Sequence, residues 1–158
     1  MKPTPINFGH FVAMSARLMR NSINHWFREQ GYDLTIDHLM IMKILCHSDG
    51  ISQQGIADFF SKDKGTITRM INTMEGKNLV VRIPDRSDRR SKLIYLTPYG
   101  KNLQQEMFQA VLDFNESLIS DIPKDDLERC VGVLGKIIDK LCNDDVACAT
   151  KIESISNP

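Results

Sequence analysis

Two stretches of this sequence carry side chains suited to contacting a polyanion. In residues 63–77, apolar residues recur every three or four positions, which predicts a helix with one buried stripe and one polar face. Hydroxyl, amide and cationic groups can bond to base edges or phosphates, and a helix has about the width that the major groove of DNA admits. The candidates on this helix and in the break before it are Ser61, Lys62, Lys64, Gly65, Thr66, Thr68, Arg69 and Asn72.

A basic segment follows shortly afterwards. Residues 79–83 and 93–96 resemble strands, and the charged, turn-rich segment PDRSDRRSK between them predicts a hairpin with a long basic loop. Arginine at such a tip can enter the adjacent minor groove or contact flanking phosphates. We expect Asp88 to orient an arginine, Arg90 or Arg86, by a charge-assisted hydrogen bond. The candidate side chains of the hairpin are Arg86, Asp88, Arg89, Arg90 and Lys92.

Charge is distributed unevenly along a chain whose formal net charge is zero. Residues 61–92 contain nine basic and four acidic side chains, for a net charge of +5, whereas residues 113–145 have a net charge of −5. Polarity of this kind can orient a polyanion toward one region of a protein. The charge pattern therefore agrees with the two candidate stretches.

Composition limits the class of protein. The chain has 158 residues, of which 42% are hydrophobic and 25% charged, which suits a globular domain and excludes a disordered or collagen-like chain. No apolar run approaches the ~20 residues of a membrane span, and the first residues lack the basic start and apolar stretch of a signal peptide. We therefore expect a cytoplasmic protein without a membrane partner.

The elements that must position the candidate residues are mostly helical. Apolar periodicity, caps and turn signals predict helices over residues 6–30, 36–48, 53–60, 63–77, 98–120 and 123–142. A short helix, a tight break, a second helix with a polar face and a basic hairpin follow one another in the order of a winged helix-turn-helix. Alone, a polar helix face is usually only solvated, and a basic hairpin is often only a loop. The expected fold class is mainly α with a small β-hairpin wing.

The hairpin resembles the wing of MarR-type (multiple antibiotic resistance regulator) transcription factors. Residues 79–100, LVVRIPDRSDRRSKLIYLTPYG, are similar to that wing, with Asp88-x-Arg90 separated by five residues from Leu96-Thr97-x-x-Gly100. Residues 52–57 (SQQGIA) and 64–69 (KGTITR) resemble the family's helix-turn-helix. The resemblance covers about residues 5–142. The chain departs from the family pattern at Gly55, where an acidic or bulkier polar residue is common, and at Gly65, where serine is common.

The resemblance implies a homodimer that regulates transcription by sequence-specific binding to double-stranded DNA. We expect a repressor that needs no cofactor and that binds a pseudo-palindromic operator. The expected organisation is one MarR-type domain over residues 1–142, with a winged helix-turn-helix at about 35–97, dimerisation helices at 6–30, 98–120 and 123–142, and a polar tail at 143–158. Independently of the resemblance, these helices carry more apolar surface than one small lobe can cover, which favours a symmetric dimer.

The resemblance also implies a small effector, commonly aromatic or anionic, that releases DNA from a cleft between the dimerisation region and the winged lobe. The residues that would line this cleft are His10, Met14, Arg17, His38 and Met42. Residues of these types are more often ordinary core or surface residues.

The sequence also bears on other functions. The chain lacks a glycine-rich phosphate loop, His-Glu-x-x-His and a Gly-x-Ser-x-Gly elbow, so we expect no enzyme. The spacing of its histidines and four cysteines predicts no metal site. Peroxide sensors of the family place a reactive cysteine in the first helix, whereas the first cysteine here is Cys46. Two alternatives stay open: a protein-interaction module that does not bind DNA, and a redox-responsive regulator that uses Cys46.

Overall fold

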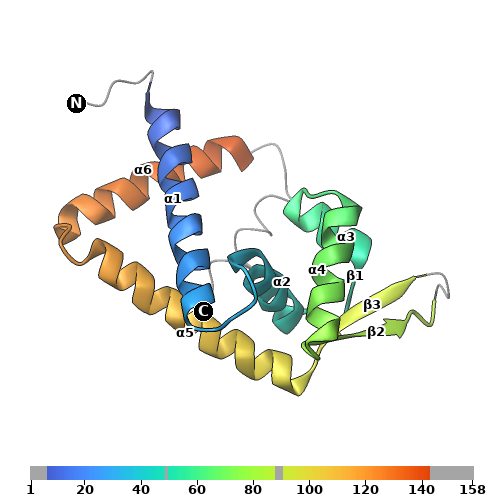
Figure 1. Cartoon of the computed structure of the whole chain (residues 1–158). Coiled ribbons are helices and arrows are strands. Elements are labelled where there is room, and N and C mark those ends of the chain that lie inside the picture. The colour runs from blue at the N-terminus through green and yellow to red at the C-terminus, as the bar shows by residue number, and fades with distance from the viewer. Residues whose placement is uncertain (1–6, 49, 88–90, 143–158) are drawn as a thin grey trace. The chain divides into compact units, whose positions relative to one another are not determined.

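The computed structural model describes residues 7–48, 50–87 and 91–142, and within them six α-helices and three β-strands (Figure 1). The chain divides into two compact units, Met1–Leu39 and Met40–Pro158, and each is described by itself. All six predicted helices are present, with ends that differ by at most two residues from the predicted ones. The polar tail expected at 143–158 lies outside the described residues.

The first unit consists of α1 (Phe8–Glu29) and the start of α2 (Ile36–His47). The chain leaves α1 through Gly31, whose positive φ of 83° suits glycine at a helix C-terminus. The buried ring of Phe27 packs against Trp26 and Tyr32, with ring centroids 5.8 and 5.9 Å away. Asn24 Oδ1 then accepts a hydrogen bond from the first backbone N–H of α2 at 2.8 Å, so side chains of α1 hold the chain reversal in place.

The second unit contains a helix-turn-helix of α3 (Gln53–Phe60) and α4 (Lys64–Gly76). Ser52 caps α3 by accepting the Gly55 N–H at 3.0 Å, and Asp63 caps α4 in the same way from Thr66. The apolar stripes of both helices face a common core that excludes water. Its fully buried members on these helices are Ile56, Ile67, Ile71 and Met74.

A three-stranded antiparallel sheet completes the winged lobe. Its strands are β1 (Ile51–Ser52), β2 (Val80–Pro84) and β3 (Lys92–Leu96), in the order β1-β3-β2. The predicted hairpin is β2–β3, which extends away from α3 and α4 (Figure 1). The sequence did not predict β1, because two residues carry no periodicity. It pairs with β3, where Ile51 lies opposite Ile94.

The chain leaves the wing into α5 (Pro98–Ile119). Thr97 Oγ1 accepts the Gly100 N–H at 2.9 Å and donates to the Asn78 carbonyl at 2.7 Å. A β-carbon at Gly100 would lie 2.1 Å from the Leu79 carbonyl oxygen, so only glycine fits at this contact. The start of α5 is therefore joined closely to the winged lobe.

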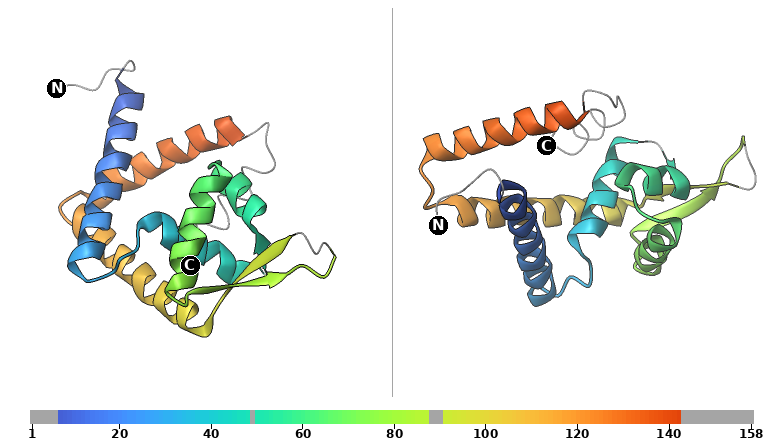
Figure 2. Two further views of the ribbon diagram at one scale, coloured as in Figure 1. Left: turned by 45° about the vertical axis from the view of Figure 1, so that its right-hand side comes forward. Right: turned by 90° about the horizontal axis from the view of Figure 1, so that it is seen from above.

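The rest of α5 and all of α6 (Lys124–Cys142) are covered much less. The buried residues of α5 all belong to its first half, and α6 has none. From the far end of α5 the chain turns back into α6 (Figure 2). Large apolar side chains exposed after α5 passes its midpoint are Leu112, Leu118, Ile122, Val131, Val133, Ile138 and Leu141. None of the described helices is long and apolar enough to cross a membrane.

Candidate nucleic-acid interface

The exposed face of α4 is the centre of the candidate site. Gly65, Arg69 and Asn72 are spaced by four and three residues, so they share one side of the helix. All three are exposed, and they lie opposite the buried stripe of α4. Lys64 and Thr73 are also exposed, whereas the other predicted residues of this helix, Thr66 and Thr68, are half-buried.

A hydrogen-bonded cluster organises the start of α4. The two carboxylate oxygens of Asp63 accept from the Thr66 N–H at 2.8 Å and from the Thr66 hydroxyl at 2.6 Å. Arg69 Nη2 donates to the same hydroxyl oxygen at 3.0 Å. The hydrogen bonds from Thr66, with a smaller effect of the Arg69 charge, lower the pKa of Asp63 below its usual value. Asp63 is thus ionised at neutral pH, and its carboxylate is engaged in capping α4.

The threonine hydroxyls of α4 bond within the protein. Thr68 Oγ1 donates to the Lys64 carbonyl at 2.8 Å and accepts from Gln53 Nε2 at 3.1 Å. Thr73 Oγ1 donates to the Arg69 carbonyl at 3.1 Å. Since each hydroxyl has one proton, these threonines offer a partner outside the helix only lone pairs and methyl groups.

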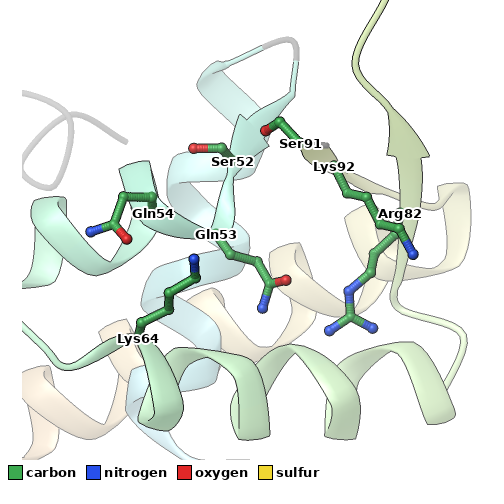
Figure 3. A pocket seen from close by; sticks show the side chains of 7 residues that line it. All are labelled: Ser52, Gln53, Gln54, Lys64, Arg82, Ser91 and Lys92. Carbon is green, nitrogen blue, oxygen red and sulfur yellow. The ribbon is translucent and has the colours of Figure 1, made fainter. Parts of the chain in front are cut away.

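A polar surface pocket of about 480 Å³ lies between the starts of α3 and α4 and the hairpin. Its lining residues are Ser52, Gln53, Gln54, Lys64, Arg82, Ser91 and Lys92. Lys64 extends from α4 toward the two glutamines of α3, while Arg82 and Lys92 extend from the hairpin (Figure 3). Three of these residues are cationic and none is acidic, which suits a phosphate group.

Arg82 was not among the predicted site residues. Its Nη2 donates to Asn72 Oδ1 at 2.7 Å, and its Nη1 forms an ion pair with Glu75 Oε2. The Arg82 side chain is only 14% exposed, so it joins strand β2 to α4 across a largely covered contact. A single arginine within the apolar run 79–83 was the signal available in the sequence, since a charge in such a run calls for a partner.

The remaining predicted DNA contacts flank these elements. Ser61, in the turn between α3 and α4, adopts a left-handed conformation with φ of 50°, and Lys62 next to it is half-buried. Arg86 is exposed in the loop after β2, where the Asp85 N–H donates to the Ser91 carbonyl at 3.0 Å. Predicted contacts that lie outside the described residues are Asp88, Arg89 and Arg90.

The residues predicted to line an effector cleft are divided between the two units. His10 and Arg17 are exposed and Met14 is half-buried in the first unit, whereas Met42 is fully buried in the second. His38 has a local partner, because its Nδ1 accepts the Thr35 N–H at 3.1 Å at the start of α2. The effector cleft stays a prediction.

Cys46 bears on the redox alternative. Its thiol donates to Gln104 Oε1 at 3.4 Å, although the residue as a whole is exposed. Burial of the sulfur raises the pKa of the thiol, and the nearby Lys101 charge opposes this only in part. Since the thiolate is the reactive form, this environment disfavours peroxide sensing by Cys46.

Comparison with known proteins gives the same family for the region that forms the site. The model of the MarR family matches residues 34–92. An uncharacterized HTH-type transcriptional regulator of Bacillus subtilis, YdgG, is 30% identical over 95 residues, which are 59% of this chain and 62% of that protein. A putative transcriptional regulatory protein for the hcr operon of Thauera aromatica is 24% identical over 61% of this chain and 58% of its own length. This chain therefore spans about three fifths of the length of these two relatives.

Solved structures show the same fold over most of the chain. Apo wild-type MarR from E. coli matches with a TM-score of 0.75 and 22% identity, covering 87% of this chain and 99% of that one. The transcriptional regulator BldR from Sulfolobus solfataricus matches with a TM-score of 0.74 and the same identity and coverage. These likenesses confirm the expected fold class, a mainly helical winged helix with a small sheet.

Proposed function

Because this chain belongs to the MarR family, we propose that it is a transcriptional regulator that binds double-stranded DNA through α4 and the β2–β3 hairpin. The observation that carries the proposal is the exposed polar face of α4 beside a pocket with three cationic residues and no acidic one. Family membership also places the chain among transcriptional regulators rather than among enzymes.

In the proposed complex, α4 enters the major groove and the hairpin reaches the adjacent minor groove. Lys64 and Lys92, on opposite sides of the pocket, neutralise a backbone phosphate that passes between the helix and the wing. The tightly bonded start of α4 holds Arg69 close to the helix, so this cation is already positioned before DNA arrives. Phosphate contacts of this type set the register of the protein and leave sequence selection to the base edges.

We further propose that two copies associate and act as a repressor at a pseudo-palindromic operator. Exposed apolar side chains on α5 and α6, together with Phe8, Val12, Leu18 and Met19 of α1, supply the surface that a symmetric dimer would bury. Paired recognition helices commonly meet half-sites about 34–36 Å apart. The domain proposed for this arrangement is residues 1–142, in a cytoplasmic protein.

A small aromatic or anionic effector that releases the DNA completes the proposal. A panel of aromatic carboxylates tested for a rise in melting temperature addresses this part. An effector is expected both to raise the melting temperature and to lower DNA affinity, because it must bind the free form better.

Selection of genomic fragments by the purified chain tests DNA binding and identifies the operator together. We expect DNA fragments to be retained at low salt. In a plot of the logarithm of affinity against the logarithm of salt concentration, each phosphate contact removed, as in Lys64→Ala or Arg90→Ala, should reduce the slope by about 0.9. Lys136→Ala on α6 is the matched control and should leave the slope unchanged. Absence of any retained duplex at low salt would favour the protein-interaction alternative.

A further inference from the structure

We propose that Arg82 restricts Asn72 to donating hydrogen bonds, so that Asn72 selects a keto base, guanine or thymine, in the major groove. This inference rests on the proposed function and names the base class that one position of α4 reads. Asparagine most often reads adenine, by donating to N7 while accepting from the N6 amino group. Arg82 already occupies one lone pair of Asn72 Oδ1 and turns this oxygen toward the protein, which disfavours that bidentate geometry.

The orientation of the Asn72 amide follows from the chemistry of its partner. Arg82 Nη2 lies 2.7 Å from Asn72 Oδ1. A guanidinium group has five donors and no acceptor, so the amide oxygen, and not the amide nitrogen, must face it. Oδ1 is therefore directed at the protein, and Nδ2 is the group left for a base.

The guanidinium is itself held in place. Arg82 also pairs with Glu75, which lies three residues after Asn72 and so on the same side of α4. The arginine side chain is 14% exposed and comes from a strand paired along its whole length with β3. Two contacts on α4 and a fixed strand leave the guanidinium little freedom to release Oδ1.

The surrounding groups strengthen the preference for acceptors. On the described part of this face, both carboxylates are engaged: Glu75 with Arg82, and Asp63 with Thr66. The cationic groups of Lys64 and Arg69 are donors only. In the major groove guanine presents two acceptors and thymine presents one, whereas the N7 acceptor of adenine lies beside an amino donor and cytosine presents an amino donor. The Asn72 amide donor and the neighbouring cations are therefore complementary to keto bases, although the threonine hydroxyls of α4 offer lone pairs only.

Selection from a randomised duplex library tests the inference, with the full-length chain and its Asn72→Ala variant. The position at which Asn72→Ala loses its preference identifies the base that Asn72 reads. At this position we expect the wild-type chain to prefer guanine or thymine by about three- to tenfold, the range that one net hydrogen bond gives. Asn72→Asp keeps the contact with Arg82 and replaces the free donor by an acceptor, so its preference should move to adenine or cytosine.

Arg82→Met tests the positioning role, because it frees Asn72 Oδ1. It should raise the frequency of adenine in the selected duplexes at the base position that Asn72 reads, and at no other position. Glu75→Gln, which keeps the bond from Arg82 to Asn72, is the matched control and should not alter the base preference. Circular dichroism melting confirms that each variant is folded. A purely structural role of Arg82 would weaken all sequences equally.

The outcomes separate this inference from the proposed function. A wild-type preference for adenine, an unchanged preference in Arg82→Met, or an Asn72→Ala variant with no altered position would each overturn the inference while DNA binding stands. A wild-type chain that retains no duplex overturns the proposed function itself.

Discussion

The winged lobe and α6 differ in how far their apolar side chains are covered. In the lobe, Ile56, Ile67 and Ile71 are fully buried between α3, α4 and the sheet. In α6, a helix of 19 residues, no residue is buried, and Leu141 is 77% exposed. One part of the second unit therefore has its own core, while the other presents an apolar stripe that a single chain leaves in contact with water.

The polar side chains around α4 are also held more firmly than those of α6. Around α4, Asp63, Thr66, Arg69 and Arg82 form short hydrogen bonds that fix side-chain orientation before any partner binds. On α6, Lys124 and Glu128 form an exposed pair at 3.8 Å, of a kind that contributes little. This difference fits the proposed function, in which a preorganised lobe binds DNA and a second copy of the chain covers the apolar stripe of α6.

Glycine substitutions should show the largest contrast. Gly100→Ala places a β-carbon 2.1 Å from the Leu79 carbonyl oxygen, and we expect it to lower the free energy of unfolding by at least about 3 kcal/mol. Gly132→Ala on α6 meets nothing within 4 Å and should raise it by up to about 1 kcal/mol, since alanine favours helix. Urea unfolding measures both. Equal effects of the two substitutions on the free energy of unfolding would contradict the difference in packing between the winged lobe and α6.

Charges placed on α6 test whether a second copy covers its stripe. Val131 is 61% exposed in the single chain, so Val131→Asp should barely change an isolated molecule. In a dimer the same change buries an unpaired carboxylate at a cost of about 3 kcal/mol or more, and sedimentation should then detect monomers. We expect Leu134→Asp, at a half-buried residue of the same stripe, to give monomers as well.

Lys136→Asp, on the opposite side of the helix, is the matched control and should leave the mass unchanged. A sedimentation mass that does not change in Val131→Asp or Leu134→Asp would contradict an interface on this stripe.

Thr97 tests the joint between the two regions. Thr97→Val keeps the shape of the side chain but removes the hydroxyl that caps α5 and reaches the Asn78 carbonyl. We expect a loss of about 1–2 kcal/mol in urea unfolding, with Thr97→Ser retaining most of the stability. A Thr97→Val variant as stable as the wild type would show that the joint does not depend on this cap.

The smallest expected effect concerns the pH dependence of the lobe. Because hydrogen bonds from Thr66 lower the pKa of Asp63 in the folded chain, the unfolded chain binds this proton first as the pH falls. The stabilisation by Asp63 is therefore complete above about pH 5 and is lost as the pH falls below about 4 toward the folded pKa. Asp63→Asn has no carboxylate to protonate at this position. Its melting temperature should therefore fall less than that of the wild type as the pH is lowered. A constant difference from pH 6 to pH 3 would contradict the pKa shift.

Most of the fold could be predicted because it depends on local patterns. The helix ends follow caps and breakers such as Ser52, Thr97 and Gly31, which act through neighbouring residues. Strand β1 was missed because it exists only through its pairing with β3, some forty residues later. The candidate site divides in the same way: polar residues of α4 were found from their spacing, whereas Arg82 was not.

Local sequence alone settled the helices, the hairpin, the polar face of α4 and the resemblance to the MarR family. Tertiary structure alone decided which polar groups remain available on that face, because a hydrogen bond between β2 and α4 joins residues ten positions apart whose contact no periodicity reveals. It also decided that the stripe of α6 stays uncovered, since periodicity tells which side of a helix is apolar but not what lies against it.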